Sequence, residues 1–148
     1  MAYKIESRQL QSAVDTPIAI KLQFDSSKLF TPSFTTNEQA VSNLKNLLLT
    51  RKGERIFQPN FGTNLLDLIF EPNTDELVGL IQDTIQEAIS VWLPYIIVEQ
   101  IDVVTADQDP TLIHQVQVTI NFTVTNTGSE QKITIIANEN GNFEVAEA

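Results

Sequence analysis

Residues 112–125 alternate between apolar and polar side chains, and this pattern limits the possible folds more than any other in the sequence. A period of two predicts a strand that buries one face, because successive side chains along a strand point to opposite sides. His114, the only histidine, falls on the same face of this predicted strand as the apolar residues. We interpret it as a packed, hydrogen-bonded core residue rather than a catalytic base. The residues predicted to face the core are Leu112, His114, Val116, Val118, Ile120, Phe122 and Val124.

Further strands are predicted on both sides of this one. Residues 96–105 form an earlier strand, and the turn-forming residues at 107–110 separate the two. Residues 126–129 predict a turn into a third strand, and the Asn-Gly pair at 140–141 is typical of another tight hairpin turn. Residues 96–148 are therefore predicted to form an antiparallel sheet.

A first helix is predicted to begin near residue 35. Thr35 and Glu38 have the spacing of a capping box, and so do Thr36 and Gln39. The residues that follow repeat their apolar positions at helical intervals. These apolar positions are Val41, Leu44, Leu47 and Leu48.

Basic residues and a glycine predict where this helix ends. Arg51 and Lys52 would stand in its last turn, where the helix dipole favours positive charge, and Gly53 would lie just beyond. A second helix is predicted from about residue 73 or 74, and Pro94 stops it. We interpret its apolar stripe as a core face rather than a groove for a partner. The stripe consists of Leu77, Ile81, Ile85, Ala88, Ile89 and Trp92.

Helices followed by an antiparallel meander predict the α+β class. Two main helices would pack on the C-terminal β-meander, with residues 1–148 forming a single domain. Its parts would be an N-terminal arm or strand over residues 1–35, a helical part over 36–94 and the sheet over 96–148. Residues 18–24 alternate like a half-buried strand, and we interpret the residues from 26 to 33 as a loop.

The composition narrows the chemistry. The 148 residues include no cysteine and one histidine. This excludes disulfides and thiolate metal sites and leaves few routes to a zinc site or a serine–histidine–aspartate triad. We therefore expect no metal and no cofactor. No apolar run approaches the roughly 18 residues of a membrane span.

Charge is divided unevenly along the chain. Residues 1–60 carry eight Lys and Arg against five Asp and Glu, whereas residues 61–148 carry one lysine against fourteen acidic residues. The two sums, +3 and −13, give the net charge of −10. The acidic part would repel nucleic acids and anionic membranes. It suits a basic protein partner, unless the acids only maintain solubility.

Three carboxylates are candidates for a glycoside-cleaving pair, namely Glu54, Asp67 and Glu71. Asp67 and Glu71 would share one helix face if residues 65–71 are helical. Acidic pairs at this spacing are common on solvated surfaces, so an enzyme is the less favoured interpretation.

The connection between the two helices has the most unusual composition. Residues 49–65 concentrate two glycines, a proline, two phenylalanines and three of the nine basic residues. One interpretation is a rigid loop in which Phe57 and Phe61 fill the core. The other is a docking loop over residues 53–64, with its backbone fixed by glycine and proline and its arginines facing acidic groups of a partner.

Three segments in this region carry a resemblance. They are Leu-Leu-Thr-Arg-Lys-Gly-Glu-Arg at 48–55, Gln-Pro-Asn-Phe-Gly-Thr-Asn-Leu at 58–65 and Leu-Ile-Phe-Glu-Pro at 68–72. They resemble the small baseplate-wedge protein family of contractile-tailed phages, which has a similar subunit in the type VI secretion baseplate. The resemblance covers about residues 36–125, and the family's order of helices and strands agrees with the prediction above.

The resemblance implies a structural function. Family members occur once in each of six wedges around the tail tube and dock on the helical core bundle of the larger wedge proteins. Their sheet offers an edge to the first ring of the tail sheath protein. We therefore expect a virion protein of the tail baseplate, assembled in the host cytoplasm, with no nucleic-acid, membrane or small-molecule partner. The alternatives are the equivalent subunit of a type VI secretion system or phage-like particle and, less favoured, a peptidoglycan-cleaving tail lysozyme.

The chain departs from the family at one point. Many members carry Glu-Pro-Arg just after the second helix, where the triplet contacts the core bundle, whereas this sequence has Leu93-Pro94-Tyr95. Arg55 is a candidate for the missing positive charge. Arginines would pair with partner carboxylates, while glycine and proline would set the loop shape. The predicted partner-binding residues are Arg51, Gly53, Arg55, Pro59, Phe61, Gly62, Pro94 and Tyr95.

Overall fold

The computed structural model describes residues 19–21, 31–68, 75–105, 115–125, 127–138 and 143–147. The helices are α1 (Thr36–Leu49), α2 (Leu65–Leu68) and α3 (Asp75–Trp92). The strands after them are β3 (Ile96–Val104), β4 (Gln115–Val124), β5 (Glu130–Asn138) and β6 (Phe143–Glu147). These strands form one antiparallel sheet in the order β3-β4-β5-β6. The α+β prediction is confirmed.

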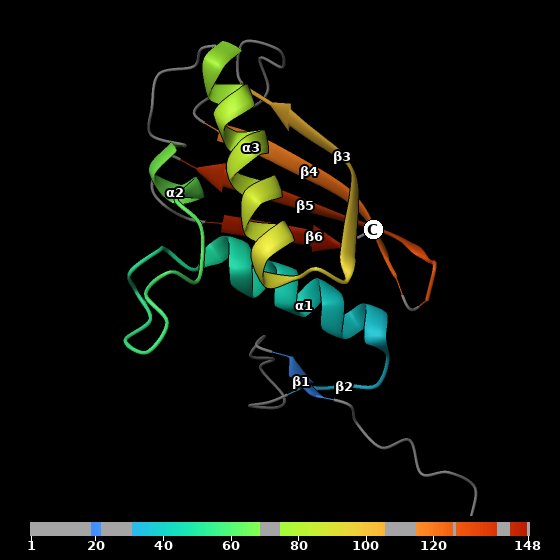
Figure 1. The fold of residues 1–148 in the computed structure, drawn as a ribbon. Coiled ribbons are helices and arrows are strands. Elements are labelled where there is room, and N and C mark those ends of the chain that lie inside the picture. Colours follow the sequence, from blue (N-terminus) through green and yellow to red (C-terminus); the bar gives the residue numbers. More distant parts are fainter. Residues whose placement is uncertain are drawn as a thin grey trace, which may run out of the picture.

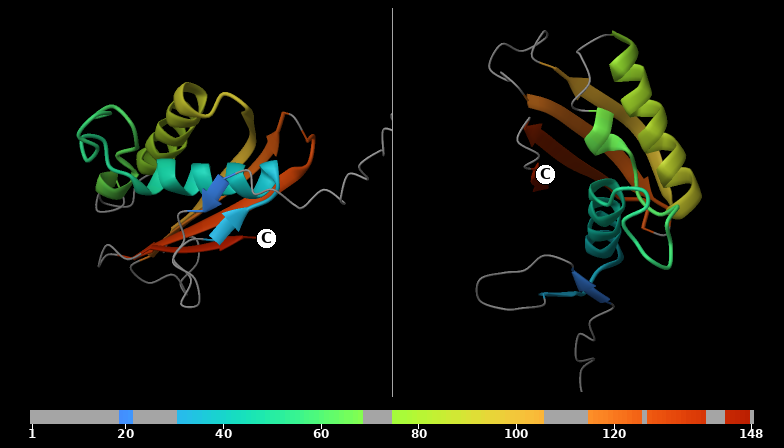
Figure 2. Two further views of the ribbon diagram at one scale, coloured as in Figure 1. Left: turned by 90° about the horizontal axis from the view of Figure 1, so that it is seen from below. Right: turned by 90° about the vertical axis from the view of Figure 1, so that its left-hand side faces the viewer.

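The two long helices lie on the same face of the sheet (Figure 1). α3 runs along the sheet, and α1 crosses below the C-terminal end of α3. The views in Figure 2 show the same two layers, with both helices on one side of the strands. Within the described part of the chain, none of the helices is long and apolar enough to cross a membrane.

A small ribbon precedes α1. β1 (Ala19–Lys21) pairs antiparallel with β2 (Thr31–Ser33), and both lie beside α1 (Figure 1). The prediction of a loop up to residue 33 is therefore wrong at its end. The proline at position 32 had indicated a loop, but a two-stranded ribbon consists only of edges, where proline is tolerated. The N-terminal arm predicted for the first dozen residues lies outside the described residues.

The start of α1 confirms one of the two predicted caps. Oγ1 of Thr35 accepts a hydrogen bond from the amide of Glu38 at 3.2 Å. The carboxylate of Glu38 in turn accepts a hydrogen bond from the amide of Phe34 at 3.2 Å. The N-cap is therefore Thr35, and Thr36 is already the first helical residue.

α1 ends earlier than predicted. The helix stops at Leu49, so Arg51 and Lys52 lie beyond its last turn and Gly53 does not cap it. Thr50 takes an extended conformation (φ −90°, ψ 127°). Its carbonyl accepts a hydrogen bond at 2.8 Å from the amide of Thr63, a residue on the returning side of the loop. This pairing across the loop takes the place of another helical turn.

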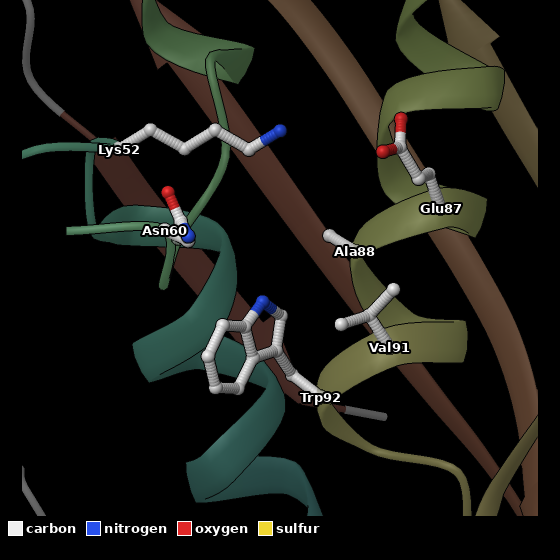
Figure 3. Close-up of a pocket in the computed structure, with 7 residues that line it drawn as sticks. Lys52, Asn60, Glu87, Ala88, Val91 and Trp92 are labelled. Carbon is white, nitrogen blue, oxygen red and sulfur yellow. The ribbon is translucent and has the colours of Figure 1, made fainter. Parts of the chain in front are cut away.

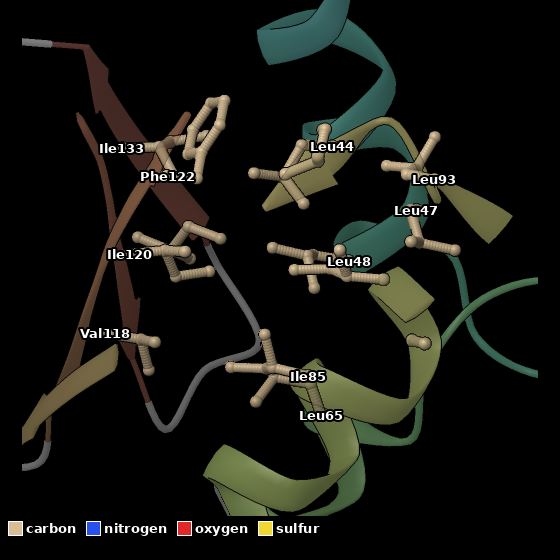
Figure 4. Close-up of a cluster of buried hydrophobic side chains, with 14 of the residues drawn as sticks. Leu44, Leu47, Leu48, Leu65, Ile85, Leu93, Val118, Ile120, Phe122 and Ile133 are labelled. Atoms are coloured by element: carbon tan, nitrogen blue, oxygen red, sulfur yellow. The ribbon is translucent and has the colours of Figure 1, made fainter. Parts of the chain in front are cut away.

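A hydrophobic core fills the space between the helices and the sheet. Figure 4 shows side chains of α1 and α3 facing those of β4 and β5. The helical stripe and the alternation along β4 are both confirmed, since every described apolar member is buried except Trp92, which is half-buried. Residues with no more than 1% exposure include Leu44, Leu47, Leu48, Leu77, Ile81, Ile85, Ile89, Val118, Ile120, Phe122, Ile133 and Ile135.

A β-bulge interrupts β3. The register steps from the pair Val98–Phe122 to the pair Gln100–Asn121, which leaves Glu99 without a partner on β4. Because of the extra residue, even-numbered side chains face the core before the bulge and odd-numbered ones face it afterwards. The residues of β3 in or against the core are Ile96 and Val98 before the bulge, and Ile101 and Val103 after it.

The two outer strands of the sheet differ. β3 pairs with β4 along almost its whole length but carries the bulge, whereas β6 pairs with residues 133–137 of β5 in unbroken register. Residues 130–132 of β5 pair with β4 and, among the described residues, have no strand on their other side. His114, the predicted turn at 107–110 and the Asn-Gly turn at 140–141 lie outside the described residues.

Candidate site: a braced loop between the first two helices

Backbone pairing closes the base of the loop formed by residues 50–64. Arg51 and Thr63 form a parallel bridge, and the amide of Lys52 donates to the carbonyl of Thr63 at 3.3 Å. Thr63 is fully buried, and its hydroxyl donates to the carbonyl of Leu48 at 2.9 Å. The two ends of the loop are therefore fixed to the C-terminal end of α1.

Gly62 makes this closure possible. Its φ is +109°, and a Cβ atom at this position would run into the carbonyl oxygen of Thr50. Only glycine combines this backbone conformation with so close an approach. Gly53 also has a positive φ, +92°, but a Cβ atom there would meet nothing within 4 Å. Both glycines set the loop shape, but only at Gly62 is there also no room for a Cβ atom.

Phe61 fixes the returning side of the loop to α3. The side chain is buried, and its ring meets Trp92 edge-on, with centroids 5.2 Å apart and an angle of 68° between the planes. The guanidinium carbon of Arg55 lies 3.8 Å from the centroid of the Phe61 ring. A cation–π contact of this kind contributes about 0.5–1 kcal/mol at an exposed site. Phe61 thus braces the loop and holds Arg55 in place.

Short-range hydrogen bonds order the outer half of the loop. The amide of Gly53 donates to the carbonyl of Pro59 at 2.7 Å across the loop, and the amide of Gln58 donates to the carbonyl of Arg55 at 3.3 Å. The carboxylate of Glu54 accepts from the amide of Arg51 at 3.2 Å. The outer half is therefore a hydrogen-bonded turn.

The tip of the loop is apolar and exposed. Ile56 is 89% exposed and Phe57 is 96% exposed. The interpretation that both phenylalanines fill the core is therefore wrong for Phe57, although it holds for Phe61. A turn that spans only a few residues cannot direct all its large side chains inward, and Phe61 is the one that reaches the core.

Arg51 is only weakly engaged within the chain. Its Nη2 lies 3.5 Å from Oδ1 of Asp67, and both side chains are more than half exposed. Exposed ion pairs contribute about 0–1 kcal/mol. A carboxylate on a partner can therefore replace Asp67 at little cost.

A groove separates the loop from α3 (Figure 3). Its volume is about 260 Å³. Lys52 and Glu87 point toward each other across it from the loop and from the helix. The other residues lining it are Asn60, Gly62, Ala88, Val91 and Trp92. The groove has an apolar floor and one charge of each sign, which suits a short side chain from another protein.

Pro94 and Tyr95 lie in the turn between α3 and β3. Pro94 is exposed, whereas Tyr95 is half-buried. The amide nitrogen of the Asn43 side chain donates to the Tyr95 hydroxyl at 2.8 Å. The amide and hydroxyl of Thr125 donate to the Tyr95 carbonyl at 3.0 and 2.9 Å. The hydrogen bonds of Tyr95 thus run to α1 and to the end of β4 rather than to the loop.

The two described members of the carboxylate set are solvated. Glu54 is exposed at the surface of the loop, and Asp67 is 63% exposed beside Arg51. A glycosidase acid is kept protonated by a desolvated pocket, and neither residue occupies one. Glu71 lies outside the described residues. In the part of the chain that the structure describes, no three His, Cys, Asp or Glu residues gather as a metal site.

Comparison with known families decides the identity of this fold. The model of the family described as "Baseplate wedge protein gp25" matches residues 36–129, well over half of the chain. The chain belongs to the gp25 baseplate wedge family. The match includes both long helices, the loop between α1 and α2 and the strands β3 and β4. The resemblance noted from three short segments is confirmed.

A curated relative and two solved structures agree with this family. The baseplate wedge protein gp25 of Enterobacteria phage T4 is 30% identical over 79 residues, which span 53% of this chain and 60% of the relative. A chain of the anti-feeding prophage baseplate is 25% identical with a TM-score of 0.58, over 70% of this chain and 80% of its own length. A Geobacter sulfurreducens protein provisionally described as a tail lysozyme has a TM-score of 0.62. At 21% identity over 70% of this chain and 91% of its own length, it shows a shared fold alone.

Sequence reasoning found the loop but missed its tip. Ile56 was not among the predicted site residues, and one of the two interpretations of the loop placed Phe57 in the core. A signal was present, because these two large apolar residues follow Arg55 in a segment with neither helical nor strand period. Adjacent apolar residues in a turn that already places Phe61 in the core are candidates for exposure.

Proposed function

We propose that this chain is a structural wedge subunit of a contractile-tail baseplate, acting as one domain over residues 1–148. It docks on the larger wedge proteins through residues 53–64, together with Arg51, Pro94 and Tyr95. It also offers an edge of its sheet to the tail sheath protein. The subunit is assembled in the host cytoplasm and works by surface contact, not by catalysis.

The bracing of the loop carries the docking proposal. A plain connector needs no buried aromatic clamp, no glycine pressed against a carbonyl and no bridge at its base. These features hold Arg55 and the neighbouring tip in one position before any partner arrives. Preorganised groups bind with a smaller loss of conformational freedom, and arginines are well suited to partner carboxylates.

A charge reversal tests the docking surface. The tagged chain is produced together with the larger wedge proteins of its own particle, and their co-purification is measured. Arg55→Glu is expected to abolish co-purification while the monomer still melts cooperatively. Lys132→Glu, an exposed lysine on β5 far from the loop in sequence, is the matched control and should behave as wild type. Unchanged co-purification of Arg55→Glu would contradict the assignment, and loss of its melting transition would make Arg55 structural.

Backbone groups along the outer side of β5 and β6 support the sheath contact. An exposed edge strand is a template for strand addition, and β6 pairs with β5 without a bulge. Because the chain has no cysteine, a single introduced cysteine can carry a photoactivatable cross-linker. We expect Ala146→Cys in β6 to cross-link to the sheath protein in assembled particles, whereas Ile97→Cys in β3 does not. Equal cross-linking from both positions, or from Ile97→Cys alone, would contradict the choice of edge.

The similarity to a chain of the anti-feeding prophage baseplate favours a second setting, a phage-like particle. The same contacts would operate there with the corresponding wedge and sheath proteins. The genes encoded beside this one distinguish the two settings. Clearing of a cell-wall suspension by the purified chain, lost in Glu54→Gln, would instead favour a lysozyme.

A further inference from the structure

The apolar tip of the loop is not explained by the fold. Ile56 and Phe57 are the two most exposed of the large hydrophobic residues that the structure describes, and they are adjacent. Single exposed apolar residues are common on protein surfaces, but a projecting pair is characteristic of an interaction site.

The tip is presented by an ordered scaffold. The amide-to-carbonyl bond from Gly53 to Pro59 closes the turn beneath it, and Phe61 secures the following segment against Trp92. An anchor that is already in position loses little backbone freedom on binding. Alanine scanning of interfaces generally finds that a few central side chains of this kind supply most of the affinity.

We propose that Ile56 and Phe57 form a hydrophobic anchor that inserts into an apolar pocket with an acidic rim on a partner protein. This rests on the proposed docking function and names the side chains that provide its affinity. The acidic rim follows from charge, because three cations, Arg51, Lys52 and Arg55, precede the tip on the same loop against a single acid, Glu54. Arg55 is held by Phe61, and Arg51 can exchange Asp67 for a partner carboxylate.

A protein pocket fits this tip better than a lipid surface. The three cations would attract anionic headgroups, but residues 61–148 carry a net charge of −13. An anionic membrane would repel that part of the chain as the tip approached. We therefore expect no binding to vesicles of phosphatidylglycerol. Vesicle binding that is lost in the double variant Ile56→Ser, Phe57→Ser would overturn the proposal in favour of a membrane.

The first test measures affinity for the purified complex of larger wedge proteins. The double variant Ile56→Ser, Phe57→Ser is expected to bind about thirtyfold more weakly or worse, the change typical of a lost hot spot. Leu80→Ser is the matched control, because Leu80 is 49% exposed on α3. Both variants should still melt cooperatively. If the double variant binds within twofold of the wild type, the anchor is overturned and the docking function is left intact.

The second test identifies the pocket in assembled particles. Phe57 is replaced by the photo-cross-linking residue p-benzoylphenylalanine, which keeps an aromatic ring at the tip. We expect a cross-link to an apolar segment flanked by acidic residues in a larger wedge protein. A cross-link to such a segment in another baseplate protein would support the anchor but contradict docking on the wedge proteins. No cross-link, or one to a second copy of this chain, would overturn the proposal.

Discussion

At the scale of single residues, two glycines in the same loop face different constraints. Gly53 and Gly62 both have positive φ, but a Cβ atom would collide with the chain only at Gly62. A side chain at Gly53 would cause backbone strain alone. A side chain at Gly62 would also push Thr50 away from the position in which its carbonyl accepts the hydrogen bond from Thr63.

We predict that Gly62→Ala lowers the free energy of unfolding by about 3 kcal/mol or more, because strain and collision add. Gly53→Ala should cost about 1 kcal/mol, from the unfavourable φ alone. Urea unfolding of the two variants measures the difference. Equal losses would show that the approach of Gly62 to Thr50 does not limit this loop.

The phenylalanines show what a sequence can predict at this scale. The residue types of residues 49–65 indicated a loop that is rigid, and the structure gives it a buried ring and a bridged base. The local pattern did not assign the rings to inside and outside, because it does not name the side chain against which a ring would pack. Only the contact of Phe61 with Trp92, 31 positions later in the chain, separates them.

At the scale of elements, α3 contains a residue that does not favour a helix. Gly79 lies inside the helix, and a Cβ atom there would meet nothing within 4 Å. We predict that Gly79→Ala raises the free energy of unfolding by about 0.5–1 kcal/mol, because alanine reduces the freedom of the unfolded chain. A higher melting temperature checks this. A lower one would mean that a neighbour needs the space.

The junction between α1 and the β1–β2 ribbon should depend on pH. The backbone amide of Phe34 lowers the pKa of Glu38 below its usual 4.5, and Lys21, whose Nζ lies 3.6 Å away, adds to this. A carboxyl group whose pKa is lowered by folding stabilises the fold at any pH above its pKa in the unfolded chain. That stabilisation is lost as the pH falls through its pKa in the folded chain. We therefore predict a loss of stability below about pH 4.5 that is smaller in Glu38→Gln. Urea unfolding at several acidic pH values measures it, and identical pH profiles for both proteins would contradict it.

Element boundaries were predicted well where a local signal sets them. Thr35 starts α1 through its own side chain, and the helix α3 ends at Trp92, just before Pro94. Element boundaries were predicted poorly where a residue distant in the sequence sets them. The end of α1 depends on Thr63, and β2 depends on its pairing with β1. The bulge at Glu99 likewise arises from register with β4, which no local pattern encodes.

At the scale of the whole molecule, charge acts against the compact state. The net charge is −10, and fourteen of the nineteen acidic residues lie after residue 60. We predict that adding sodium chloride to about 0.3 M raises the melting temperature, because salt screens repulsion within the acidic part. The exposed pairs Arg51–Asp67 and Lys21–Glu38 are screened too, but each contributes little. A melting temperature that falls with salt would show that attractive pairs outweigh the repulsion.

The layered architecture followed from the sequence because both of its periods are long and uninterrupted. The helical stripe of α3 and the alternation of β4 each point one face to a shared core. The family resemblance came from short segments around a loop, where function places unusual residues. The contacts with other proteins could not be derived in the same way, since they depend on surfaces that are not part of this chain.

The bulge at Glu99 also limits how many neighbours the sheet can acquire. A sheet with two regular edges can accept a strand on each side, so copies joined in this way form chains of any length. Here the bulge breaks the even spacing of hydrogen-bonding groups along β3, whereas the pairing of β6 with β5 keeps its register. In the terms of polymer chemistry, a sheet with one regular edge is monofunctional: it can begin one row of strands but cannot link two.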